Sequence, residues 1–137
     1  MANGQPMTIF QVAGRAMSAQ LVRMNTTASN LANAGGIAGS ADAAYKTMKP
    51  VFRTSYDQAT GLATVDVEKV VTAGEAPTKR YDPANPMADK DGNIFEAAVD
   101  ETRELVDMME TSRSYQNNVE VMQTAKQLIV DTLKMGR

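Results

Sequence analysis

Two groups of side chains have the types and the spacing that chemistry would need, and both offer only oxygen atoms. Glu101 and Glu104 form a pair of carboxylates that could act as general acid and general base. Asp89, Asp91 and Asn93 alternate with other residues, as the oxygen ligands of a calcium ion do. The chain has no His and no Cys, so the commonest general base, the commonest metal ligand and all thiol chemistry are excluded.

Neither group stands in the sequence context that its chemistry requires. A calcium-binding EF-hand loop has Gly at its sixth position and Glu at its twelfth, whereas Gly92 directly follows Asp91, and an Asp-Gly turn accounts for the same residues. Glu101 and Glu104 begin a predicted helix, with no apolar pocket indicated around them. We interpret them as a solvated helix start that complements the helix dipole. The sequence therefore predicts no catalytic residue, no metal site and no cofactor, and a protein that is not an enzyme.

A more unusual feature is a group of uncharged amides. Residues 28–34 read ASNLANA and close a segment, residues 9–34, that contains two Arg but no acidic residue and no Pro. On a helix, four small polar side chains would share one side, namely Thr26, Ser29, Asn30 and Asn33. An ordinary solvated face carries charges instead. Two interpretations stay open: capping of the helix end, which explains Asn33 but not Asn30, and close contact with other helices.

Two long helices, one near each end of the chain, must position these side chains. Apolar residues recur at steps of three and four through residues 8–34, and Gly35 and Gly36 then end the helix. No Gly or Pro occurs from residue 99 to residue 135, and this segment keeps a heptad pattern. The heptad positions are Leu105, Met108, Ser112, Tyr115, Val119, Met122, Lys126, Ile129 and Leu133.

The middle of the chain has a different composition. Residues 35–44 are small and predict a linker. Residues 46–56 and 62–72 are rich in β-branched and aromatic side chains and predict a β-hairpin, with Pro50 at an edge position or a bulge. Residues 76–95 contain Pro77, Pro83 and Pro86, which predict an ordered but irregular loop. The predicted fold is α+β, with two long terminal helices that pair as a coiled coil and a small β-hairpin and irregular loop between them in the sequence. The predicted segments are 1–41 for the first helix and linker, 42–98 for the hairpin and loop, and 99–137 for the last helix.

Charge and hydropathy exclude several classes of partner. The net charge is −2 and no basic cluster occurs, which argues against nucleic acid. No apolar run approaches membrane-spanning length, so direct membrane insertion is not expected. The opening residues 1–7 have no basic residue and do not resemble a secretory signal peptide; whether they are disordered or part of an export signal stays open. The first segment has two basic and no acidic residues and the last has five basic and seven acidic ones, which suits pairing between the two helices.

Three stretches of the sequence resemble a known family. AMSAQLVRMNTTASNLANAGG resembles the N-terminal signature of the bacterial flagellar axial proteins, which form rod, hook and hook-associated structures. YDPANPMADKDGNI and VDETRELVDMMETSRSYQNNVEVMQTAKQLIVDTLKMG are similar to the proximal rod proteins of that family. The stretch EAAVD lacks the Pro that many relatives carry, which allows the last helix to begin nearer Asn93, with Glu96 in a capping box.

The resemblance implies a structural subunit, exported unfolded through the flagellar type III apparatus without signal cleavage. Its partners would be copies of itself and other flagellar rod proteins, packed through the terminal helices around a central export channel in the basal body. The interface would then include Met17, Leu21, Met24, Ala28, Asn30, Leu31, Asn33, Met108, Ser112, Tyr115, Val119, Met122, Ile129 and Leu133. A cytoplasmic coiled-coil adaptor or export chaperone is the alternative, and an enzyme is the weakest interpretation.

Overall fold

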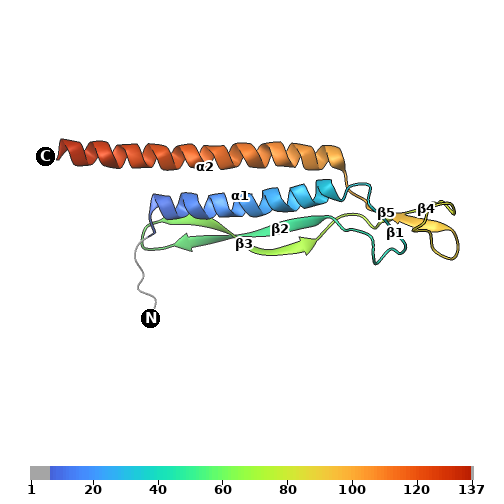
Figure 1. Cartoon of the computed structure of the whole chain (residues 1–137). Helices are drawn as coiled ribbons and strands as arrows, with labels where there is room; N and C mark the ends of the chain where they lie inside the picture. The colour runs from blue at the N-terminus through green and yellow to red at the C-terminus, as the bar shows by residue number, and fades with distance from the viewer. Residues whose placement is uncertain (1–6, 137) are drawn as a thin grey trace.

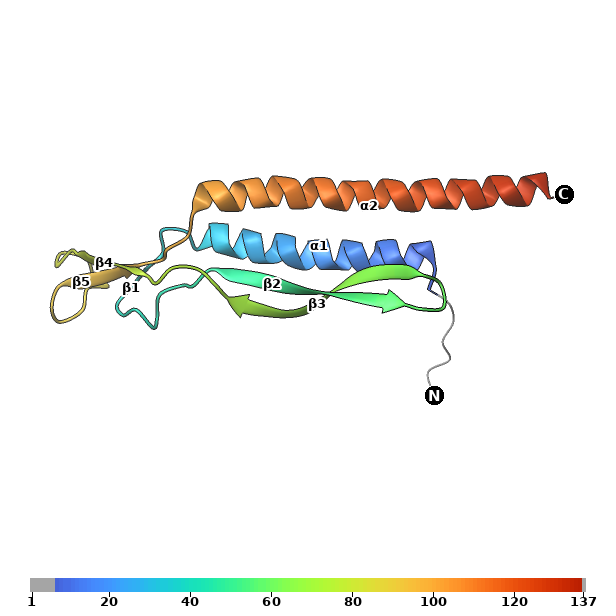
Figure 2. The ribbon, with the colours of Figure 1, turned by 180° about the vertical axis from the view of Figure 1, so that it is seen from behind.

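The computed structural model describes residues 7–136 and shows an elongated molecule built from two antiparallel helices and two small sheets (Figure 1). Helix α1 lies between helix α2 and the β2–β3 ribbon, and the sheet formed by β1, β5 and β4 lies beyond one end of the helices (Figure 2). Residues 1–6, most of the opening segment whose role the sequence leaves open, lie outside the described residues. The elements are α1 Ile9–Ala32, β1 Ile37–Ala38, β2 Met48–Asp57, β3 Leu62–Thr72, β4 Thr78–Tyr81, β5 Asn93–Glu96 and α2 Glu101–Met135.

Helix α1 confirms the prediction for residues 8–34 to within two residues at its end. Thr8 and Gln11 form a capping box at the start, in which each side chain accepts a hydrogen bond from the other residue's backbone N–H. At the other end Asn33 is the C-cap, and Gly35 follows with a φ of 71°. This left-handed conformation favours Gly, which is why the helix ends where the sequence predicts.

Helix α2 begins at Glu101, with Asp100 as its N-cap accepting a hydrogen bond from the backbone N–H of Arg103. The alternative start near Asn93 is wrong, because Asn93 and Glu96 are the first and last residues of strand β5. With 35 residues against the 24 of α1, α2 is longer by roughly 16 Å at 1.5 Å per residue.

The β2–β3 ribbon confirms the predicted hairpin. Its turn contains Gly61, whose φ of 69° lies in the left-handed region that favours Gly. Val51 pairs with Lys69 and the next residue, Phe52, pairs with Val67, so the register shifts by one residue at this point. The extra residue of this bulge, Glu68, lies on β3, while Pro50 pairs in register with Val70. Of the two predicted places for Pro50, the structure therefore shows the edge position, because both strands of a two-stranded sheet are edges.

Asp57, the last residue of β2, ties this turn to the start of α1. Its carboxylate accepts hydrogen bonds from the Thr60 hydroxyl at 2.9 Å, from the Ala59 N–H at 3.0 Å and from the Met7 N–H at 3.2 Å. These bonds, that of Thr60 first, lower the pKa of Asp57 because they favour the charged form. The segment before α1 is thereby held against the end of the ribbon.

The second sheet was not predicted from the sequence. Strands β1 and β4 both pair with β5. The predicted linker therefore contributes one strand, β1, and the predicted irregular loop contributes β4 and most of β5. The three Pro residues flank these strands and interrupt none of them. Between β4 and β5, the Asp89 carboxylate accepts hydrogen bonds from the N–H groups of Asp91 and Asn93, which forms the turn that the Asp-Gly pair predicts.

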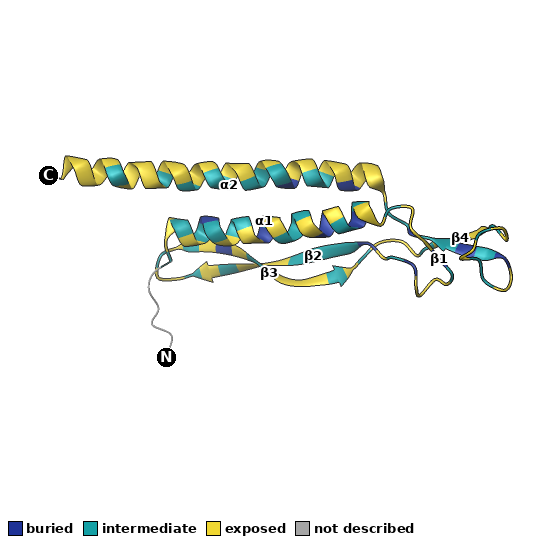
Figure 3. Ribbon diagram, in the orientation of Figure 1, coloured by how far each residue is buried: buried dark blue, intermediate teal, exposed yellow. Residues whose placement is uncertain are grey.

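Small side chains dominate the interior. Among the residues that the structure describes, five of the six buried hydrophobic ones are Ala, and the largest fully buried side chains are Ile94, Asn30 and Thr111. In Figure 3 the buried and half-buried positions of α2 lie along the side that faces α1, while the outer side is exposed. Alanines let the backbones of the elements approach closely. Apart from Ile94, the large apolar side chains of the described residues lie on exposed or half-buried faces.

Candidate subunit interface

Within the chain, α2 contacts α1 through polar side chains. The buried positions on α2 each lie one residue before a position of the predicted heptad seam. Glu104 and Thr111 are buried on α2, and Ser114 and Asn118 line the gap that faces Ala16 on α1. One residue corresponds to about 100° around a helix. The heptad positions are therefore only partly used by the chain's own helix pairing.

The apolar residues predicted for the interface on α1 form a stripe along one side of the helix. Leu21 is 44% exposed and Ala28 is also exposed, while the other three apolar members are half-buried. The members are Met17, Leu21, Met24, Ala28 and Leu31, and we call them the α1 stripe.

The predicted interface residues of α2 divide into two groups along its length. Met108, Ser112, Tyr115, Val119 and Met122 are half-buried where α2 runs beside α1. Ile129 and Leu133 are exposed in the part of α2 that extends past the start of α1 (Figure 1).

This extending part of α2, residues 126–135, exposes four large apolar side chains, those of Leu128, Ile129, Leu133 and Met135. Leu128 is 61% exposed, Leu133 is 68% exposed and Met135 is 82% exposed. Contiguous exposed apolar side chains on a polar-rimmed helix usually mark an interaction surface. We call residues 126–135 the α2 extension.

The two amides of the ASNLANA segment have different places in the structure. Asn33 is exposed and its Nδ2 donates to the backbone carbonyl of Ser29 at 2.8 Å, so it supports the end of its own helix. Asn30 is 1% exposed, and its side chain makes four hydrogen bonds within the chain. Contact between Asn30 and a neighbouring subunit stays a prediction, although its polar atoms are already occupied in this conformation.

The interpretation of Glu104 as part of a solvated helix start is wrong, although Glu101 is exposed as expected. Glu104 is 3% exposed because its carboxylate points toward α1, where Oε2 accepts a hydrogen bond from Asn30 Nδ2 at 3.0 Å. Lys49 Nζ lies 3.8 Å from Oε1 of the same carboxylate. The sequence signal that could have located this residue is the amide on α1, since a buried carboxylate requires a donor.

Further ion pairs continue from Glu104 along the junction of α1, α2 and β2. Lys49 Nζ lies 3.7 Å from Asp107 Oδ2, and Arg23 Nη2 lies 3.2 Å from Asp107 Oδ1 and 3.7 Å from Glu110 Oε2. This joins one cation from α1 and one from β2 to three carboxylates of α2. The pairing agrees with the complementary charges of the two terminal segments.

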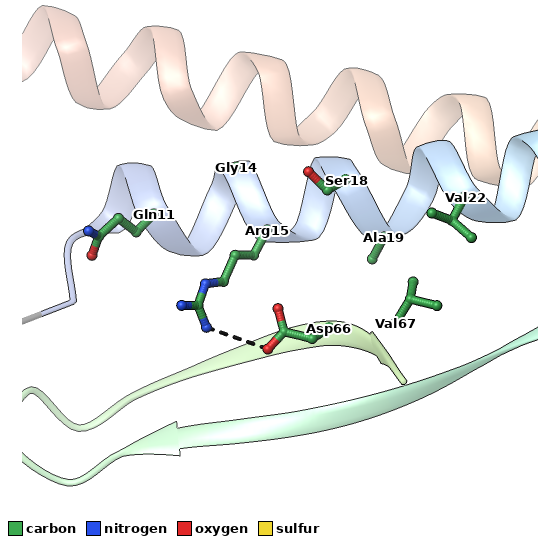
Figure 4. A pocket seen from close by; sticks show the side chains of 8 residues that line it. All are labelled: Gln11, Gly14, Arg15, Ser18, Ala19, Val22, Asp66 and Val67. Atoms are coloured by element: carbon green, nitrogen blue, oxygen red, sulfur yellow. Dashed lines mark hydrogen bonds and ion pairs between the residues drawn. The ribbon is translucent and has the colours of Figure 1, made fainter. Parts of the chain in front are cut away.

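A groove of about 540 Å³ runs between α1 and β3. Figure 4 shows Arg15 reaching from α1 across it toward Asp66 of β3, to which Arg15 Nη1 lies at 3.4 Å. The small side chains of Ser18 and Ala19, together with Gly14, leave the groove open. An exposed ion pair of this kind contributes about 0–1 kcal/mol. This groove was not predicted from the sequence. The feature that could have indicated it is Gly14, a residue without a side chain in the interior of a predicted helix.

Within residues 7–136, neither helix combines the length and the apolar character needed to cross a membrane. Over the same residues, His, Cys, Asp and Glu side chains do not gather in threes at a place that could hold a metal ion. The surfaces that distinguish this part of the chain are the α1 stripe and the α2 extension.

Comparisons with known proteins identify the relatives of the chain. Residues 10–36 match the family described as flagella basal body rod protein, and residues 91–135 match the C-terminal family of the flagellar basal body rod FlgEFG proteins. The chain is 41% identical over 133 residues to the flagellar basal-body rod protein FlgC of Salmonella typhimurium, covering 96% of this chain and 98% of that protein. It is 39% identical over 132 residues to the protein of the same name from Escherichia coli O157:H7, with the same coverage. Identity to that of Agrobacterium fabrum is 30% over 127 residues, 91% of each chain.

Proposed function

We infer the function from one premise: the chain belongs to the family of the flagellar basal-body rod protein FlgC. On that premise it is a structural subunit of the proximal rod of the flagellar basal body. Similarity over 96% of the chain to proteins of that name carries this proposal and disfavours the alternative of a cytoplasmic adaptor or export chaperone. The subunit has no catalytic activity in this proposal.

The subunit assembles through the outward faces of its terminal helices. The α1 stripe, the half-buried heptad positions of α2 and the α2 extension pack against other copies and against other rod proteins in a coiled-coil manner. The observation that supports this is the division of apolar side chains on the two helices, where the buried ones are Ala and the large ones are exposed or half-buried. Complete burial of one such Leu contributes about 1.5–3 kcal/mol, and these contacts repeat along a helical assembly.

The predicted interface is retained in this proposal. Asn33 and the apolar positions of both helices face outward or flank the helix pair and are available to neighbours. Asn30 also acts inside the subunit, because its four side-chain hydrogen bonds are made to its own chain, and its contact with a neighbouring subunit stays a prediction. The assembled helices form a tube that surrounds the export channel and transmits torque.

The subunit reaches the rod through the flagellar type III export apparatus, without cleavage of a signal peptide. The membership of the chain in the family of flagellar basal-body rod proteins supports this part of the proposal. The export apparatus is therefore a transient partner of this chain, and the rod is its final location.

Cofractionation with basal bodies tests the proposed function. A tagged copy of the full chain, produced at native levels, is expected to copurify with intact basal bodies after detergent extraction of the cells. A strain that cannot export flagellar subunits serves as the control, and in it the tagged chain should stay in the soluble fraction. Recovery of the chain only as a free cytoplasmic species in both strains would contradict a rod subunit and support the adaptor.

A further inference from the structure

A group of hydrogen-bonded residues joins three elements around a single buried amide. The group contains Asn30 of α1, Tyr45 of the segment before β2, Met48 at the start of β2 and Glu104 of α2, and we call it the Asn30 node. Asn30 and Glu104 are 1% and 3% exposed. These residues are up to 74 positions apart in the sequence, so the node exists only when all three elements are in place.

The hydrogen bonds of the Asn30 node are complete. Asn30 Nδ2 donates to the Met48 carbonyl at 2.9 Å and to Glu104 Oε2 at 3.0 Å. Asn30 Oδ1 accepts from the Met48 N–H at 2.9 Å and from the Tyr45 hydroxyl at 2.8 Å. The amide thus uses both donors and two acceptor positions, and it binds the backbone of β2 in the way a neighbouring strand would.

Such a network is stabilising only when it is complete. If the ribbon were undocked while the helices stayed paired, the Asn30 amide would lose both of its bonds to Met48 and would face Glu104 alone. If α2 were displaced while the ribbon stayed docked, the Glu104 carboxylate would lose its buried donor, and Lys49 and Asp107 would separate as well. Unpaired buried groups cost more than the net gain of the same bonds when made.

We propose that the Asn30 node couples the pairing of α1 with α2 to the docking of the β2–β3 ribbon, so that the three elements become ordered as one cooperative unit. The node also fixes the register between the two helices, because Asn30 and Glu104 can meet at only one axial position. An ordered ribbon is then a condition for presenting the outward faces of α1 and α2 together. This coupling acts within one chain and does not depend on the proposed role in the rod.

Hydrogen exchange on the full-length chain at increasing urea concentrations tests the coupling. In the native chain, the Met48 amide and the central amides of α1, β3 and α2 are expected to share one opening free energy and one urea dependence. Asn30→Ala should raise exchange about 10- to 100-fold in all three elements together, because it leaves Glu104 Oε2 without its donor and the Met48 N–H without its acceptor. Faster exchange confined to the neighbours of Met48, with both helices unchanged, would overturn the proposal.

Asn33→Ala is the matched control. It removes the same type of side chain about one turn further along α1, and the side chain of Asn33 donates only to a carbonyl of its own helix. Its effect should stay within the last turn of α1. If Asn30→Ala does not fold, Tyr45→Phe keeps the ring and removes the hydroxyl, which contacts Asn30 Oδ1 at 2.8 Å and Ser29 Oγ at 3.1 Å. Exchange should then rise about 2- to 10-fold in α1, the ribbon and α2 alike. A rise limited to the segment around residue 45 would contradict the coupling in the same way.

Discussion

Replacing Leu128 and Leu133 together by Gln abolishes assembly of the rod in our account while leaving the isolated chain almost as stable as before. Both side chains lie in the α2 extension and are 61% and 68% exposed, so little packing within the chain is lost. Gln is a good helix former of similar size, and surface changes of this kind usually alter stability by about 0.5 kcal/mol or less. In the assembly the same changes bury two unpaired amides in every subunit, at about 1–3 kcal/mol each.

The measurement compares motility and basal-body integrity with secretion of the subunit and with urea unfolding of the purified chain. A matched control, Asp131→Gln with Lys134→Gln, introduces the same residue twice into the same turns on the polar side and leaves the net charge unchanged. We expect the control strain to swim. Normal motility of the Leu128→Gln, Leu133→Gln strain would show that the α2 extension does not form a rod contact.

Ile94→Ala is expected to have the largest effect on folding, destabilising the β1–β5–β4 sheet by about 2–5 kcal/mol. Ile94 is 0% exposed on the central strand of that sheet and is the only large apolar side chain that is fully buried in the described part of the chain. The sheet is small, so neighbouring side chains can refill the space only slightly.

The destabilisation of this sheet is measured by hydrogen exchange of the β4 and β5 amides and by urea unfolding. Val70→Ala on β3 is the control, because Val70 is a 43% exposed apolar residue of a strand, and its cost should be clearly smaller. Equal destabilisation by the two substitutions would mean that Ile94 does not form the core of the sheet. The helices lie outside this sheet (Figure 1), so their exchange should change little in the Ile94→Ala chain.

The long elements of the fold were predictable because local sequence determines them. The three- and four-residue periodicity with Gly35 and Gly36 located α1, and the absence of Gly and Pro located α2. The alternating β-branched residues located both strands of the ribbon. Each of these signals lies within the element that it predicts.

The second sheet and Glu104 were not predictable in the same way. Strand β1 has two residues and β4 has four, too few for a periodic pattern, and both are stabilised by pairing with β5 far along the chain. Glu104 follows the pattern of a solvated helix start, and only the distant Asn30 and Lys49 make its burial possible. The apolar heptad of α2 was identified correctly as a pattern, but the helix uses a more polar face for its own partner. Such choices depend on tertiary contacts.

Cysteine labelling tests the central claim, that the outward apolar faces of the two helices are subunit contacts, most directly. Because the native chain has no Cys, Leu21→Cys and Leu133→Cys each introduce a single reactive thiol, and Thr111→Cys places one at a position that is 0% exposed. The account predicts that a maleimide labels positions 21 and 133 rapidly in the purified subunit and at least tenfold more slowly in intact basal bodies, with full labelling restored after dissociation. Position 111 should be protected in both states. Equally rapid labelling of positions 21 and 133 in intact basal bodies from a motile strain would contradict the account.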